Sequence, residues 1–200
     1  MSTRPHLRDE PVGKPESASG LGSAPAETRA LRAALLDLLK ELHVRTLIDA
    51  PCDDFGWLGD GELPVESYVG LDIVEPLVVR NAAAYGNARR RFQKHDLTRD
   101  PLPEGDLLLC RDCLVHLSFA NIARVFDHVR RSRITYLLAT TFTRHEDNED
   151  IQDGDWRMLN LERAPFFLGA PLAVLVEGCS DTDGPYADKS LALWRVADFP

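Results

Sequence analysis

The chain has 200 residues, enough for one domain with a buried core, and its 44% hydrophobic and 28% charged residues are typical of a soluble globular protein. No apolar run approaches the ~20 residues that a membrane-spanning helix needs, and residues 1–22 lack the apolar segment of a secretory signal, so we expect a cytoplasmic protein with no membrane partner. The net charge of −9 argues against nucleic-acid binding, which requires a basic surface.

The N-terminal part predicts an arm followed by a helix. Residues 1–22 are rich in Pro, Gly, Ser and charged residues, which predicts a disordered arm before one folded domain at residues 23–200. A helix is expected from about Ser23, because the leucines beyond it repeat at helical spacing. These leucines are Leu31, Leu35, Leu38, Leu39 and Leu42.

Two predicted strands that end in acidic residues come next. Residues 46–49 and 67–72 are short and mostly apolar, and they end at Asp49 and Asp72. The two acids are 23 residues apart, about what one strand–helix–strand unit needs to place two strand ends side by side. Ligands of open α/β sheets bind at the carboxyl ends of the strands, so the turn after Asp49 marks a candidate ligand site.

Strands and helices alternate through the rest of the chain. Helices are predicted over residues 75–85 and from residue 119, where Ser118 is a suitable cap. Further strands are expected at 90–93, 106–110, 134–141, 172–176 and 190–196, the last two as a hairpin. This order predicts an α/β fold with a seven-stranded, mostly parallel sheet, helices on both faces and an antiparallel C-terminal strand.

Several motifs together resemble a known family. They are Thr46-Leu-Ile-Asp-Ala-Pro-Cys-Asp-Asp-Phe-Gly-Trp57, Ser67-Tyr-Val-Gly-Leu-Asp72, His95-Asp96-Leu97, the segment 106–117 and Tyr136-Leu-Leu-Ala-Thr-Thr-Phe142. In their order and spacing, over roughly residues 28–197, the chain resembles the class I S-adenosylmethionine (SAM)-dependent methyltransferases, which have a Rossmann-like fold. The resemblance implies SAM as the cofactor and methyl transfer to oxygen or nitrogen of a small polar metabolite, such as a sugar, a nucleoside or a specialised metabolite.

The resemblance also implies where the cofactor lies. The implied cofactor-binding residues are Asp49, Ala50, Pro51, Cys52, Asp54, Phe55, Trp57, Asp72, Ile73, Asp96, Leu97, Cys110 and Arg111. Asp72 is expected to accept from the ribose hydroxyls and Asp96 to meet the adenine amine; the alternatives are a surface acid and a turn acid. The family usually has glycines in the first turn, whereas this chain has Asp53, whose carboxylate would repel that of SAM.

Two segments are candidates for catalysis and acceptor binding. His116 is the one histidine in the segment after the fourth strand, and an ordinary pKa of about 6.5 suits a general base. Asp112 is expected to accept from the substrate or orient His116; capping or packing is the alternative for both. The long polar stretch 148–161 is expected to cover the pocket and to bind substrate through Trp156, Arg157 and Asn160, or else to be a solvated lid.

Other features add little to this assignment. Four cysteines, Cys52, Cys110, Cys113 and Cys179, make no disulfide framework, and no metal site is expected because no second Cys/His pair has suitable spacing. The run Arg89-Arg90-Arg91 fits a solvated helix end better than a phosphate-binding patch. We expect a small-molecule substrate and leave a homodimer open. The rival functions are a non-catalytic SAM-binding or regulatory module and a nicotinamide-dependent dehydrogenase, against which the missing G-x-G-x-x-G argues.

Overall fold

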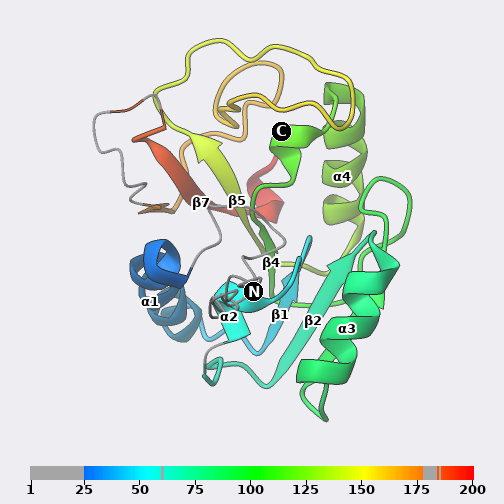
Figure 1. Ribbon diagram of the computed structural model, residues 1–200. Helices are drawn as coiled ribbons and strands as arrows, with labels where there is room; N and C mark the ends of the chain where they lie inside the picture. The colour runs from blue at the N-terminus through cyan, green and yellow to red at the C-terminus, as the bar shows by residue number, and fades with distance from the viewer. Residues whose placement is uncertain (1–24, 60, 178–183, 185) are drawn as a thin grey trace, which may run out of the picture.

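The computed structural model describes residues 25–59, 61–177, 184 and 186–200 (Figure 1). Its centre is one seven-stranded sheet with the strand order β3-β2-β1-β4-β5-β7-β6. The strands are β1 (Thr46–Asp49), β2 (Ser67–Asp72), β3 (Arg90–Lys94), β4 (Leu107–Cys110), β5 (Tyr136–Phe142), β6 (Ala173–Val176) and β7 (Lys189–Arg195). Strands β3 to β5 are parallel, and β7 is antiparallel to both of its neighbours, which confirms the predicted sheet.

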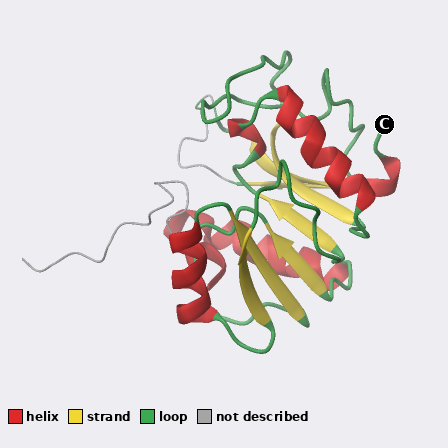
Figure 2. Ribbon diagram, turned by 90° about the vertical axis from the view of Figure 1, so that its right-hand side faces the viewer, coloured by secondary structure: helices red, strands yellow, loops and turns green. Residues whose placement is uncertain are grey.

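Helices cover both faces of the sheet (Figure 2). They are α1 (Pro25–Glu41), α2 (Gly56–Gly59), α3 (Glu75–Tyr85) and α4 (Phe119–Arg131), with short 3₁₀ helices η2 (Leu114–His116) and η3 (Val196–Asp198). Side chains from α1, α2 and α3 belong to one hydrophobic cluster, and those from α4 belong to the other. Within the described part of the chain, no helix has both the length and the apolar character needed to cross a membrane. The predicted arm, the Ser23 start of the first helix and Cys179 lie outside the described residues.

The central strands are buried on both faces, which explains their uninterrupted apolar sequences. Successive side chains of a strand point to opposite faces. Leu47 and Leu109 therefore pack under α1 and α2, while Ile48 and Leu108 pack under α4. A strand enclosed in this way needs apolar residues at every position rather than at alternate ones.

Helix α4 is the clearest case of a helix predicted by periodicity. Its buried residues are Ile122, Val125, Phe126 and Val129, spaced as one helical stripe. Ser118 is the N-cap and accepts a hydrogen bond from the backbone N–H of Asn121 (3.4 Å). His128, Arg130 and Arg131 lie in the last turn, where positive charge complements the helix dipole.

The strand order places a switch point between β1 and β4. The chain proceeds outward from β1 to β2 and β3, and then returns to the other side of β1 to form β4. Asp49, the last residue of β1, is in register with Gly70 of β2 and Leu109 of β4. The loops that follow β1 and β4 therefore diverge at this point, where doubly wound sheets bind their ligands.

Candidate active site

The chain turns sharply immediately after β1. Asp53 and Phe55 have positive φ values of 45° and 58°, in the left-handed region that residues other than glycine enter rarely. The carboxylate of Asp54 accepts a hydrogen bond from the backbone N–H of Gly56 (2.9 Å) at the start of α2. We call residues 50–55 the β1 loop.

Hydrogen bonds to β2 and α3 fix the β1 loop. The backbone N–H of Cys52 donates to the carbonyl of Leu71 (2.9 Å), and that of Asp53 donates to Oδ2 of Asp72 (3.1 Å). From α3, the buried side chain of Asn81 donates to the carbonyl of Asp53 (2.6 Å). The loop is therefore held against the end of β2 although it lacks the glycines that commonly shape such turns.

Asp72 is a buried acid at the carboxyl end of β2, with 4% of its surface exposed. Its Oδ1 accepts from the backbone N–H of Val74 (2.8 Å), in addition to the bond that Oδ2 accepts from Asp53. A carboxylate has roughly four acceptor positions, so further positions remain for a ligand. The residue borders a pocket of about 110 Å³ between the ends of β1 and β2 and the segment after β3.

This pocket, which we call the Asp72 pocket, contains six of the thirteen predicted cofactor residues. They are Ala50, Pro51, Asp72, Ile73, Asp96 and Leu97. Its walls are mostly apolar, and its volume lies below the ~300–1,000 Å³ of sites that enclose a whole drug-sized ligand. It is therefore the size for one flat ring system rather than for a complete cofactor.

Polar groups at the rim of the Asp72 pocket have distinct hydrogen-bonding roles. Nε2 of His95 is enclosed and has no hydrogen-bond partner among the described residues, and burial lowers the pKa of this imidazole despite nearby Asp100 and Asp96. Partial burial opposes ionisation of Asp96, but hydrogen bonds from Thr98 (2.7 and 2.9 Å) hold its pKa below the ordinary value. The rim therefore offers one carboxylate, and an enclosed imidazole nitrogen without a partner among the described residues lies in the same segment.

Two carboxyl groups beside β1 are less acidic than usual. Burial raises the pKa of Asp49 to about 8, although its Oδ2 accepts a hydrogen bond from the hydroxyl of Tyr68 (2.6 Å). Burial, with the negative charges of Asp72 and Asp54, raises the pKa of Asp53 to about 6. At neutral pH, Asp53 is therefore ionised next to other acids, and this end of the site favours positively charged ligand groups.

No family model matches the sequence, and no curated protein matches it. Solved structures do resemble the fold. The methyltransferase domain of a bacterial Hen1 aligns with 57% of this chain and 66% of its own length, at 15% identity and a TM-score of 0.51. Human N-acetylserotonin methyltransferase in complex with SAM aligns with 84% of this chain and 52% of its own length, at 14% identity and a TM-score of 0.58.

Magnesium protoporphyrin IX methyltransferase from Synechocystis PCC 6803, with bound S-adenosylhomocysteine (SAH), covers 85% of this chain and 84% of its own length, at 13% identity and a TM-score of 0.58. This chain has the class I methyltransferase fold. The match spans less than two thirds of the Hen1 domain and of the human enzyme.

In this methyltransferase fold, the remaining predicted cofactor residues lie outside the Asp72 pocket. Cys52, Phe55, Trp57 and Cys110 are buried in the core. The ring of Phe55 packs against Tyr68 (4.8 Å between centroids), and residue 55 has a positive φ. The side chains of these four residues are therefore enclosed by the core and do not line the Asp72 pocket, so their contact with the cofactor stays a prediction.

Arg111 belongs to a buried ion network rather than to the Asp72 pocket. Its Nη2 lies 2.7 Å from Oε2 of Glu177, and its guanidinium lies 5.1 Å from the ring centroid of Trp57. Nζ of Lys189 lies 2.7 Å from Oδ2 of Asp112 and 3.4 Å from Oε2 of Glu177. The network joins the end of β4 to β6 and β7.

The position of His116 bears on two predictions: that Asp112 orients this histidine, and that His116 is a general base. Nδ1 of His116 lies 2.9 Å from the carbonyl oxygen of Asp155, whereas Asp112 turns toward Lys189. Asp112 therefore does not orient His116. Since a carbonyl oxygen only accepts, Nδ1 carries a proton, and Nε2 of the exposed ring is the nitrogen that remains for another partner.

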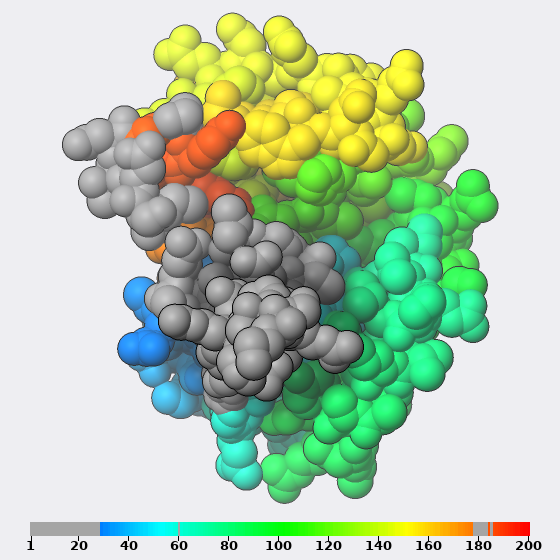
Figure 3. Space-filling model, viewed as in Figure 1, coloured from blue at the N-terminus to red at the C-terminus, as the bar shows by residue number. Residues whose placement is uncertain are grey.

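The long segment 143–172 contains no regular helix or strand and lies over the segment after β4 (Figure 3). The guanidinium of Arg157 donates to the carbonyls of Glu149, Leu114 and Leu117 at 2.7 to 3.1 Å. The side-chain amide of Asn160 donates to two more carbonyls within the segment. Both side chains are buried and hold the segment together, so they do not present donors to an acceptor molecule as predicted.

Trp156 is the predicted acceptor residue that remains accessible. Its side chain is half-exposed and packs edge-on against Phe142 at the end of β5 and against Tyr186, which precedes β7. The sequence analysis missed Tyr186, as it missed Asn81 and the Glu177–Lys189 pair, because each is brought to the site by a distant segment and no local motif marks it. It quoted His95 within a motif but gave this residue no role.

Proposed function

We propose that this chain is an SAM-dependent methyltransferase that transfers a methyl group to oxygen or nitrogen of a small polar metabolite, such as a sugar, a nucleoside or a specialised metabolite. One observation carries the proposal: the Asp72 carboxylate and the β1 loop meet at the carboxyl edge of the sheet and border the same pocket. The fold supports it, because structures with this fold include methyltransferases named as complexes with SAM or SAH.

The residues of the Asp72 pocket fit the nucleoside part of SAM. The free acceptor positions of Asp72 suit a ribose diol, which has two hydroxyl donors. Ala50 and Leu97 supply apolar surface for the faces of adenine, while Asp96 and the unpaired Nε2 of His95 supply acceptors at its edge. The acidic β1 loop would lie near the ammonium and sulfonium groups.

When bound, SAM supplies a methyl carbon attached to a positively charged sulfur. The chain mainly has to align an acceptor lone pair with that carbon and keep water out, because proximity and orientation dominate such displacements. The segment after β5 would cover the acceptor, and the half-exposed ring of Trp156 would stack on it. Asp112, which follows β4 and is partly exposed, would accept a hydrogen bond from the methyl acceptor in addition to its ion pair with Lys189.

His116 would serve as the general base for a hydroxyl acceptor. Its Nε2 is the free acceptor of the neutral ring, because Nδ1 is tied to the carbonyl of Asp155. A proton moving from the acceptor to Nε2 would create an imidazolium whose Nδ1–H is still hydrogen-bonded. An amine acceptor that is already neutral needs no such base.

Isothermal titration calorimetry with SAH and with NADH, followed by a transfer screen with methyl-labelled SAM, tests this function. We expect SAH to bind, NADH not to bind, and label to reach at least one hydroxyl or amine metabolite. The absence of SAH binding would overturn the proposal. Binding without transfer to any acceptor would instead favour a SAM-binding regulatory module.

A further inference from the structure

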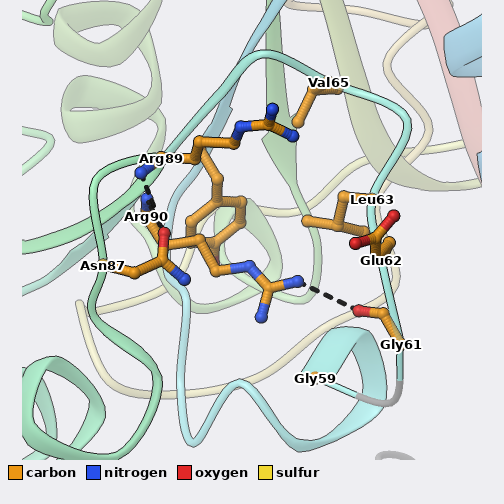
Figure 4. A pocket seen from close by; sticks show the side chains of 9 residues that line it. Gly59, Gly61, Glu62, Leu63, Val65, Asn87, Arg89 and Arg90 are labelled. Carbon is orange, nitrogen blue, oxygen red and sulfur yellow. Dashed lines mark hydrogen bonds between the residues drawn. The ribbon is translucent and has the colours of Figure 1, made fainter.

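A second cavity lies away from the Asp72 pocket, on the face of the sheet that carries α1 to α3 (Figure 4). It has a volume of about 430 Å³, within the range of small-molecule sites. Gly61, Leu63 and Val65 form one wall, and Asn87, Arg89 and Arg90 form the other. It adjoins the first residues of β3, whereas Asp72 is the last residue of β2 and pairs with the last residue of β3. The two pockets share no lining residue.

The wall formed by Arg89 and Arg90 is positively charged. Both side chains extend toward the 61–65 segment (Figure 4). Nη2 of Arg90 donates to the carbonyl of Gly61 (3.0 Å), and its guanidinium lies 5.5 Å from the ring centroid of Phe55, which holds it in place. Among the described residues, no carboxylate forms an ion pair with either arginine, and Glu62 is the one acid in the lining.

A third guanidinium approaches the same place from α1. Nε and Nη2 of Arg32 are shielded from solvent and have no hydrogen-bond partner among the described residues. Its Nη2 comes within 3.5 Å of the position that a Cβ on Gly61 would occupy. Buried donors without a partner call for an explanation, such as a bound ion. The guanidinium groups of Arg90 and Arg32 therefore both lie near Gly61, and Arg89 lines the same cavity closer to Val65 (Figure 4), in a chain whose net charge is −9.

We propose that this cavity binds a small phosphate ester. The phosphate lies against Arg89 and Arg90, because the planar guanidinium matches phosphate oxygens with paired hydrogen bonds. The organic group lies against Leu63 and Val65, which give the opposite wall its apolar surface. The next arginine in the run, Arg91, is exposed and does not line the cavity, so only part of the basic run belongs to the site.

Calorimetric titration of the full chain with phenyl phosphate and with inorganic phosphate tests the site. We expect phenyl phosphate to bind more tightly, because only the ester reaches the apolar wall. Arg89→Gln should lower the affinity for phenyl phosphate about fivefold to tenfold, because one charge-assisted contact is lost. Arg91→Gln is the matched control, with the same charge removed one strand position away from the cavity, and should change the affinity less than twofold.

Glu62→Gln should change the affinity in the opposite direction. Removal of the one acid in the described lining should raise the affinity for phenyl phosphate about twofold to fivefold, since a repulsive charge is lost. Saturating SAH should leave all these affinities unchanged, because it is expected at the other pocket. Three results would overturn the proposal: no saturable binding up to ~10 mM, equal losses in Arg89→Gln and Arg91→Gln, or displacement of phenyl phosphate by SAH.

Discussion

The buried carboxyl group of Asp49 makes the stability of the fold depend on pH. In the unfolded chain Asp49 ionises near its ordinary pKa of 3.8, whereas burial raises the pKa to about 8 in the folded protein. The folded state therefore holds a proton that the unfolded state has lost. The stability that this proton contributes is fully present below pH 3.8 and decreases as pH rises toward 8.

The size of the effect follows from the same values. Each pH unit between the two pKa values changes the free energy of unfolding by ~1.4 kcal/mol, so Asp49 accounts for roughly 3–4 kcal/mol of lost stability between pH 5 and pH 8. Asp49→Asn removes the titration and keeps an oxygen that can accept from the Tyr68 hydroxyl. The variant should therefore lose less stability than the natural protein over this range.

Urea denaturation of both proteins at pH 5, 6, 7 and 8, followed by circular dichroism, measures the difference. Asp37→Asn is the control, because Asp37 is an exposed acid paired with Lys40 on α1, and its curve should parallel that of the natural protein. The reasoning is wrong if the curves of Asp49→Asn and the natural protein stay parallel from pH 5 to pH 8.

Three further predictions concern the proposed activity. SAM should bind about tenfold more tightly at pH 8 than at pH 5, because ionised Asp53 attracts its positive groups and the pKa of Asp53, about 6 in the free protein, returns toward 3.8 on binding. Calorimetry of Asp53→Asn should show an affinity for SAM that does not depend on pH, and tighter binding at low pH would place the SAM carboxylate beside Asp53 instead. His116→Ala should lower kcat toward a hydroxyl acceptor by about 10²-fold or more, measured by label transfer, with SAH affinity nearly unchanged; full activity would remove His116 as the base. Asn81→Ala should lower the free energy of unfolding by about 1–3 kcal/mol and weaken SAH, because the hydrogen bond to Asp53 is lost; denaturation and calorimetry that match the natural protein would exclude a role for Asn81 in holding the loop.

The strands of the sheet could be predicted because local patterns in the sequence mark them. Uninterrupted apolar runs mark strands enclosed on both faces, and the two acids 49 and 72 mark strand ends on neighbouring strands. The fifth strand was placed two residues early, because Ile134 and Thr135 continue its apolar and β-branched sequence although β5 begins at Tyr136. The predicted arm at residues 1–22 and the domain limits stay predictions.

The site could be predicted less completely than the strands, because the side chains that contact one another there lie far apart in the sequence. Asn81 reaches Asp53 across 28 residues, and Glu177 reaches Arg111 across 66. Polarity also misled the prediction for Arg157, since a buried guanidinium can serve backbone carbonyls as well as a ligand. The ring of Phe55 is also enclosed by Tyr68, Tyr85 and Phe92, and no local pattern in the sequence indicates these contacts.

The central claim is that the Asp72 carboxylate holds the ribose of SAM, and its amide substitution tests it directly. Calorimetry of SAH with Asp72→Asn, which keeps one acceptor oxygen for the β1 loop, should show affinity lowered by about 10-fold to 100-fold, as expected for lost charge-assisted hydrogen bonds. Glu75→Gln removes an exposed acid three residues away and should bind SAH normally. Equal affinity of Asp72→Asn and the natural protein would contradict the account.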